Sequence, residues 1–388
     1  MRDILVLCPQ ERDIRALGAA GVGGEYRVRF VGSDLDRLTA FEPETFLAEC
    51  ESLEADGVAG TKDRSALLAA ILAGRRGLPG PTPDALFSCQ HKPTSRAIQR
   101  RVAPEATPLF ALLNGLPPRF GPPWFVKPAV GRLSQLTRRV DAEAVLAAID
   151  TGDGYQAAYA QIARLAGLPV ELVHGYLVEE LVDGMEVTLE GYVFDGRVTT
   201  IGITDSVKYP NTNSFERFEY PSALPDGRKA ELTDLAARLM PALGFDGGFF
   251  NVEFLVPAEG PAWIVEVNGR LASQFAPLVQ AVEGRSTYEA LVRLACGEDP
   301  AWQRGVRNGV AISYALRVFE DAYVEAVPEP EEGLEVLARP GLRLSEQGTN
   351  DPYSYRLAIF SEWGQTRNEA VERCRARAAE LRFELRPL

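Results

Sequence analysis

The stretch 249–268 has the pattern of a β-hairpin with one acidic side chain in each strand. Both strands are apolar, and the turn between them contains Pro257, Gly260 and Pro261. Side chains alternate between the two faces of a strand, so a hairpin that closes symmetrically about this turn places Glu253 directly opposite Glu266. The pattern therefore predicts two carboxylates close together on one face of a sheet.

Two neighbouring carboxylates inside apolar strands need an explanation. They could face solvent, share one proton, or bind a cation between them. Asn268 adds a neutral oxygen to the face that carries Glu266, and two carboxylates with an amide oxygen suit Mg²⁺ or Mn²⁺. A carboxylate pair that shares a proton would also suit glycoside hydrolysis, although that chemistry gives no role to the lysines described below.

Composition excludes several classes of protein. The chain has 388 residues and a net charge of −13, which disfavours nucleic-acid and anionic-membrane partners. No apolar run is long enough to cross a bilayer, and the N-terminal run predicts a first strand rather than a signal peptide. Five scattered cysteines and only two histidines predict reduced thiols in a cytoplasm, without a zinc site or a His-rich metal site.

The predicted elements change in kind along the chain. Strands at 4–8, 26–31 and 56–59 alternate with helices at 11–17 and 64–72, which predicts a parallel α/β unit. Beyond a Pro- and Gly-rich break at 115–123, the predicted elements are a strand at 124–128, helices at 141–148 and 155–165, and antiparallel strands over 176–268, interrupted by a helix at 230–243. Asp195-Gly196 predicts a hairpin turn, capping boxes begin at Ser286 and Thr366, and the last eighty residues predict strands and one helix.

The order Glu253, Glu266, Asn268 and Arg270 resembles the magnesium signature of the ATP-grasp superfamily. The run 266–270, Glu-Val-Asn-Gly-Arg, looks most like the carboxylate–amine ligases, which include L-amino-acid ligases. The resemblance covers residues 60–300. It implies an α/β protein, α+β in its catalytic part, with an N-terminal parallel domain (1–93), a small lobe (94–175), a large lobe (176–305) and a C-terminal α+β segment (306–388).

The same resemblance implies where ATP would bind. The backbone around Glu180 and Val182 would meet adenine, and Glu186 or its neighbour would hold the ribose. Lys92 and Lys127 would reach the phosphates, and the loop 129–135, with one glycine, would close over them. The implied nucleotide-binding residues are Lys92, Lys127, Ser134, Glu179, Glu180, Leu181, Val182 and Glu186.

The resemblance also implies the reacting groups. Glu253, Glu266 and Asn268 would hold two Mg²⁺ ions. Arg270 would bind phosphoryl oxygens or the substrate carboxylate, Lys127 would steady the transferring phosphate, and Glu219 is expected to receive the substrate amine.

The implied activity is an ATP-dependent ligase that joins a carboxylate to an amine through an acylphosphate, acting on amino acids or small peptides. The expected partners are these small molecules, and a homodimer stays open. Two alternatives remain. His91 before Lys92 and the single-glycine loop favour a non-catalytic nucleotide-binding module, and a biotin-carboxylase-like or kinase-type ATP-grasp enzyme is the other.

Overall fold

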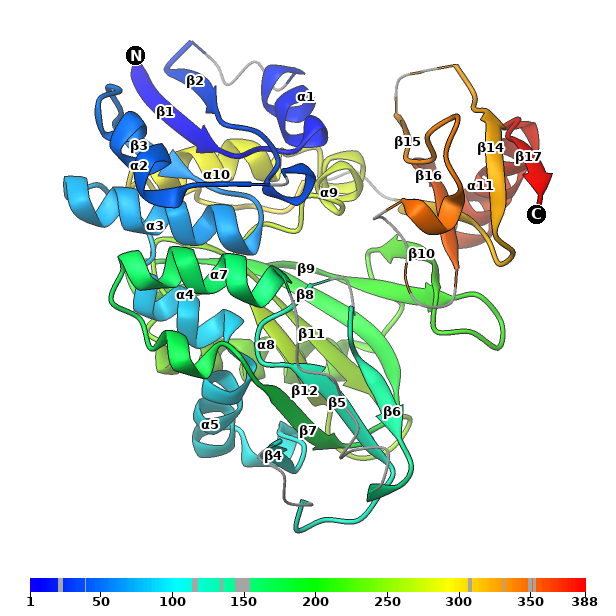
Figure 1. Ribbon diagram of the computed structural model, residues 1–388, viewed down its shortest axis with the longest axis horizontal. Helices are drawn as coiled ribbons and strands as arrows, with labels where there is room; N and C mark the ends of the chain where they lie inside the picture. The colour runs from blue at the N-terminus through cyan, green and yellow to red at the C-terminus, as the bar shows by residue number, and fades with distance from the viewer. Residues whose placement is uncertain are drawn as a thin grey trace. The chain divides into compact units, whose positions relative to one another are not determined.

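The computed structural model describes residues 1–19, 24–38, 40–113, 118–132, 135–143, 154–305, 309–329, 331, 333–347, 351 and 354–388 (Figure 1). Contacts divide the chain into two compact units. The first unit comprises Met1–Ile201, Leu224–Ser273 and Ser286–Gln303, and the second comprises Gly202–Ala223, Gln274–Arg285 and Arg304–Leu388.

The first unit begins with the predicted parallel α/β arrangement. Strand β1 (Arg2–Leu7) lies between β2 (Tyr26–Val31) and β3 (Gly57–Ala59), and both pairings are parallel. The inner residues of β1 are fully buried, as expected of a central parallel strand. The helices here are α1 (Glu11–Ala19), α2 (Pro43–Glu51) and α3 (Asp63–Arg76). The predicted strands and two predicted helices are confirmed, and α2 is an addition to them.

A four-stranded antiparallel sheet follows in the same unit. Its order is β4 (Phe110–Leu112), β7 (Tyr176–Glu180), β5 (Trp124–Pro128) and β6 (Arg138–Val140). The helices near it in sequence are α4 (Pro83–Gln90), α5 (Lys92–Val102) and α7 (Gly154–Leu165). Because β7 pairs with β5, this sheet extends past residue 175, the predicted boundary between the lobes. The predicted helix at 141–148 falls mostly outside the described residues.

The first unit also contains the long antiparallel strands that carry the predicted hairpin. The order is β12 (Trp263–Asn268), β11 (Gly248–Val256), β8 (Met185–Phe194) and the start of β9 (Arg197–Lys208), with helices α8 (Asp226–Ala242) and α10 (Thr287–Ala295) in this part of the chain. Asp195 and Gly196 both have positive φ, at 50° and 70°, which is the geometry of the predicted two-residue turn. The hydroxyl of Ser286 accepts the Glu289 N–H at the start of α10, which confirms the serine half of the predicted capping box.

The second unit continues β9 into β10 (Phe215–Tyr220), β13 (Val310–Val318), β16 (Tyr355–Gly364) and β15 (Leu334–Val336), in that order. Helix α11 (Arg367–Glu380) contributes Ala370 and Cys374 to a core with Ile312, Ala358 and Phe360. The remaining elements are α9 (Ala276–Glu283) and the pair β14 (Ala322–Ala326) and β17 (Glu384–Pro387). The predicted strands with one C-terminal helix are confirmed, and Thr366 caps that helix.

Two predictions from composition can be compared with the structure. The five cysteines are all free, as their scattered positions predict. Among the described helices, none combines the length and the apolar character needed to cross a membrane.

Candidate active site

Glu253 and Glu266 lie opposite each other on β11 and β12, in the register predicted from the sequence. Two residues along each strand, Asn251 pairs with Asn268, and the register shifts immediately after Glu253. The Asn268 side-chain N–H group donates to Asn251 Oδ1 at 2.9 Å and to Glu253 Oε1 at 3.3 Å. Asn268 therefore fixes the Glu253 carboxylate against the sheet.

The two glutamates have opposite electrostatic environments. Burial raises the pKa of Glu253 well above its usual value, and the charges of Glu266 and Glu186 raise it further. Burial alone would also raise the pKa of Glu266, but Lys92, Lys127 and Arg270 outweigh burial and lower it. Lys92 Nζ lies 3.3 Å from Glu266 Oε2. The pair therefore holds one proton more readily than it holds two negative charges.

This donor set fits a hard divalent cation. Two facing carboxylates and a nearby amide are oxygen ligands of the kind that Mg²⁺ binds, and a cation between them would remove their mutual repulsion. Within the described ranges, no group of three or more His, Cys, Asp or Glu side chains is placed to hold a metal. The residues that would hold the ion are Glu253, Glu266 and Asn268, whose Oδ1 accepts a hydrogen bond from Arg270 at 3.3 Å.

A buried ion cluster lies behind Glu266. Lys127 Nζ is 2.8 Å from Glu179 Oε2, and Arg96 Nε is 2.5 Å from Glu179 Oε1. Both cations also donate to the carbonyl of Val265, at 3.0 Å for Lys127 and 2.8 Å for Arg96. Burial lowers the pKa of Lys127 to about 8. The anion that a buried lysine after an apolar strand requires is therefore Glu179 in this structure.

His91 forms the junction between α4 and α5 and thereby positions Lys92. Its Nδ1 accepts the Thr94 N–H at 3.3 Å, and its Nε2 is 3.0 Å from the carbonyl of Leu172. Burial lowers the pKa of His91, which favours the neutral ring that this pair of contacts requires. Lys92 is the first residue of α5, and its N–H donates to the carbonyl of Ala129 at 2.8 Å.

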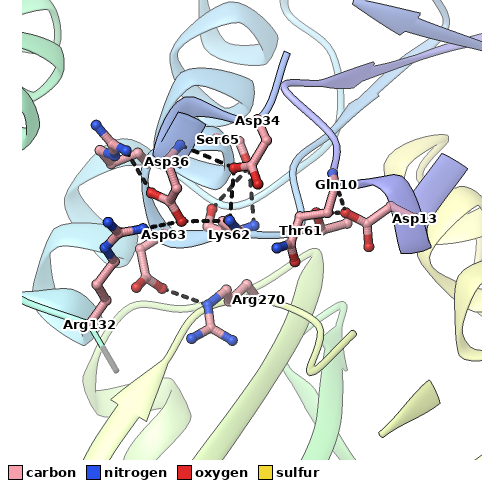
Figure 2. A network of polar contacts seen from close by, with 11 residues as sticks. Gln10, Asp13, Asp34, Asp36, Thr61, Lys62, Asp63, Ser65, Arg132 and Arg270 are labelled. Atoms are coloured by element: carbon pink, nitrogen blue, oxygen red, sulfur yellow. Dashed lines mark hydrogen bonds and ion pairs between the residues drawn. The ribbon is translucent and has the colours of Figure 1, made fainter. Parts of the chain in front are cut away.

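Arg270 is held from the N-terminal part of the chain. Its Nε donates to Asp63 Oδ1 at 2.7 Å (Figure 2). Its carbonyl accepts from Asn251 Nδ2 at 3.0 Å. Asp63 also lines a small pocket with Lys92, Glu266 and Asn268. Gly131 and Tyr155 also line this pocket.

Comparison with known proteins identifies the fold that carries these residues. Residues 120–277 match the family described as ATP-grasp domain. The L-amino acid ligase from Bacillus licheniformis superposes with a TM-score of 0.79, over 99% of this chain and 98% of that chain. The chain has the ATP-grasp fold. The two sequences are 17% identical, so this likeness concerns the fold.

Two curated proteins resemble this chain in sequence. An uncharacterized protein of Sinorhizobium fredii, y4rH, is 29% identical over 231 residues, which are 57% of this chain and 45% of that protein. Carnosine synthase 1 of Gallus gallus is 25% identical over 331 residues, which are 74% of this chain and 36% of that protein. The chain thus spans less than half the length of both relatives. ATP-grasp proteins typically bind ATP with Mg²⁺ and are typically ATP-dependent ligases.

The structure places most predicted ATP-grasp site residues in the first unit. The side chain of Glu179 belongs to the buried ion cluster, and Glu180 pairs with Leu109 through both its N–H and its carboxylate. Leu181 is exposed, and Glu186 contributes charge next to Glu253. Contact of these residues and of Val182 with a nucleotide stays a prediction. Ser134 lies outside the described residues.

Glu219 lies in the second unit, where it is buried. It accepts from Arg217 Nε at 2.7 Å and pairs with Arg367. Its predicted role toward the substrate amine stays a prediction. Asp63 and Arg96 were not predicted, because each lies far along the chain from its partner and no local spacing connects the two.

Proposed function

We propose that the chain is an ATP-dependent carboxylate–amine ligase that acts on amino acids or small peptides. The observation that carries this proposal is the facing pair Glu253 and Glu266, with Lys92 and Arg270 beside it, in a chain with the ATP-grasp fold. The fold shared with an L-amino acid ligase and the sequence similarity to a carnosine synthase support the choice of substrates.

In the proposed reaction, an oxygen of the substrate carboxylate attacks the γ-phosphorus of ATP. The bond between the γ-phosphorus and the oxygen that bridges it to ADP breaks. ADP leaves, and the substrate carboxylate becomes an acylphosphate. The amine nitrogen then attacks the acyl carbon, phosphate leaves, and the nitrogen loses a proton. The phosphate is required because a free carboxylate is a poor acyl donor.

The residues of the first unit supply binding and orientation. Mg²⁺, when bound, would neutralise charge on the ATP phosphates. Glu253, Glu266 and Asn268 would hold it, while Lys92 faces the same pocket as Glu266. The guanidinium of Arg270 presents donors suited to a planar carboxylate or phosphoryl group. We also propose that Lys127 approaches the phosphates by exchanging Glu179 for them.

The proposal also includes the cellular compartment and the partners of the enzyme. The free cysteines support a reducing compartment such as the cytoplasm. The net charge of −13 favours small-molecule partners over nucleic acid or anionic membranes. The proposal leaves a homodimer open, and analytical ultracentrifugation measures the oligomeric state.

The experiment is a screen for ADP release over all pairwise combinations of amino acids, with Mg²⁺ and mass spectrometry of the products. We expect ADP and a ligated product with at least one pair, and loss of both in Glu266→Gln. Glu259→Gln is the matched control, because Glu259 is exposed on the turn of the same hairpin. Equal ADP release by wild type and Glu266→Gln would contradict the proposal.

One observation favours a non-catalytic nucleotide-binding module. Lys127, a predicted phosphate ligand, already has a carboxylate partner in Glu179. Calorimetry separates the two functions, because a module would bind Mg·ATP without producing ADP with any substrate pair. Bicarbonate-dependent phosphate release, or a phosphorylated product without ligation, would instead indicate a carboxylase or a kinase.

A further inference from the structure

Asp63 and Arg270 form an ion pair between two distant parts of the chain. Asp63 is the first residue of α3, and Arg270 follows β12 by two residues. The distance from Arg270 Nε to Asp63 Oδ1 is 2.7 Å. The Asp63 side chain is 12% exposed, and the Arg270 side chain is 24% exposed. A pair that is sheltered but not closed off retains much of its strength and can still meet a ligand.

The pairing determines which edge of the guanidinium is available. Arginine has five N–H donors, in a fixed planar arrangement. Asp63 accepts from Nε, and Asn268 Oδ1 accepts from Nη2 at 3.3 Å. Figure 2 shows the two terminal nitrogens of Arg270 pointing away from Asp63. The terminal edge, rather than the Nε side, is therefore the edge that can bind a carboxylate or phosphoryl group in two-point fashion.

Asp63 is itself held rigidly. A carboxylate at the start of a helix is stabilised by the helix dipole. The Asp63 carbonyl accepts from Gln90 Nε2 at 3.1 Å, and Gln90 Oε1 accepts from the buried Tyr159 hydroxyl at 2.8 Å. The preceding residue, Lys62, donates to Asp34 at 2.8 Å (Figure 2). The acceptor that orients Arg270 thus belongs to a fixed frame.

Asp63 also competes with the glutamate pair for Arg270. The negative charges of Asp63, Glu253 and Glu266 all attract the guanidinium, and Asp63 is the carboxylate that it contacts, at 2.7 Å. Without Asp63, the guanidinium would be drawn toward Glu253 and Glu266, the oxygens that a metal ion needs. Asp63 therefore keeps the cation near these carboxylates without letting it replace the metal.

We propose that Asp63 is a positioning residue that holds Arg270 with its terminal edge toward the reacting anion and off the Glu253–Glu266 pair. The inference rests on the proposed ligase function for its catalytic consequence. Its structural content, that Asp63 acts through Arg270, is independent of the substrates.

A double-mutant cycle tests the proposal with Asp63→Ala, Arg270→Ala and the double variant. We expect Asp63→Ala to lower kcat about tenfold and Arg270→Ala to lower it on the order of a hundredfold. Added to Arg270→Ala, the Asp63 change should have no further effect. Asp63→Asn, which keeps the shape of the side chain, should lower kcat by less than Asp63→Ala does. It takes the place of Asp63→Ala in the cycle if that variant fails to fold. Asp84→Asn is the matched control, because Asp84 is exposed in the first turn of α4.

The same cycle measured on Mg·ATP binding by calorimetry, with the Arg270 Nε–H signal followed by nitrogen NMR, does not depend on turnover. Loss of the paired Nε–H signal in Asp63→Ala, with coupled effects on binding or kcat, supports the proposal. Equal effects of Asp63→Ala in the wild-type and Arg270→Ala backgrounds overturn it, as does the absence of any effect. If wild type produces no ADP while the binding cycle is coupled, the ligase function fails and the positioning role stands.

Discussion

Glu253 and Glu266 face each other across β11 and β12, yet the structure moves their pKa values in opposite directions. The difference arises from the cations Lys92, Lys127 and Arg270, which outweigh burial at Glu266 and of which Lys92 lies 3.3 Å from its carboxylate. One carboxyl is therefore kept ionised while its neighbour tends to hold a proton. A divalent cation that binds both must displace that proton, so metal binding should release protons and depend on pH.

Lys92→Gln should weaken metal binding more at low pH than at high pH. Lys92 lowers the pKa of Glu266, so its removal raises that pKa and lets protons compete with the metal at higher pH than in wild type. Calorimetric titration with Mn²⁺ in the presence of ADP, at pH 6 and pH 8, measures the effect. Lys229→Gln, a surface change on α8, is the control. The same loss of affinity at both pH values would contradict this explanation.

The ion cluster predicts unequal effects of two substitutions. Glu179→Gln leaves Lys127 and Arg96 buried without a counter-charge and should cost about 3–5 kcal/mol of folding stability. Lys127→Met should cost less, because Arg96 still pairs with Glu179. Denaturation with urea compares the two variants. A larger loss in Lys127→Met than in Glu179→Gln would show that Arg96 does not neutralise Glu179 alone.

Glu190 predicts a change of stability with pH. It is 3% exposed on β8, accepts the Ala272 N–H at 2.7 Å, and burial raises its pKa to about 8. The folded state binds this proton more tightly than the unfolded state, so stability is greatest below the usual glutamate pKa and falls as pH rises toward 8. The loss is at most about 5 kcal/mol.

Glu190→Gln should remove that part of the pH dependence, because an uncharged amide can still accept the Ala272 N–H. Melting temperatures at pH 5.5 and pH 8.5 should differ less in Glu190→Gln than in wild type. Glu259→Gln should behave as wild type. A steeper dependence on pH in Glu190→Gln would mean that another group causes it.

The hairpins were predictable because their signals are local. Alternation with a period of two and a turn rich in Pro and Gly determine the pairing of Glu253 with Glu266, and Asp195-Gly196 determines the β8–β9 turn. Leu136 shows the limit of residue preference, since it has a φ of 59°, in the left-handed region that favours glycine. Its conformation is set by its surroundings rather than by its own preference.

The ion pairs that orient the site were not predictable from one sequence. Asp63 and Arg270 are 207 residues apart, and Arg96 and Glu179 are 83 residues apart. No periodicity connects residues at such separations, because their contact is made by the packing of different elements. Helix α4, which ends at His91, was not predicted either. Its start has a local signal, because Thr82 caps the helix and Pro83 is its first residue.

The carbonyl of Val265 connects the four-stranded sheet that contains β5 to the hairpin of β11 and β12. Val265, directly before Glu266, accepts hydrogen bonds from both Lys127 on β5 and Arg96 on α5. A ligand that draws Lys127 away would release one of these two bonds and loosen the backbone beside Glu266. Nucleotide occupancy at one sheet would then be sensed at the carboxylates of the other before any large movement of the chain.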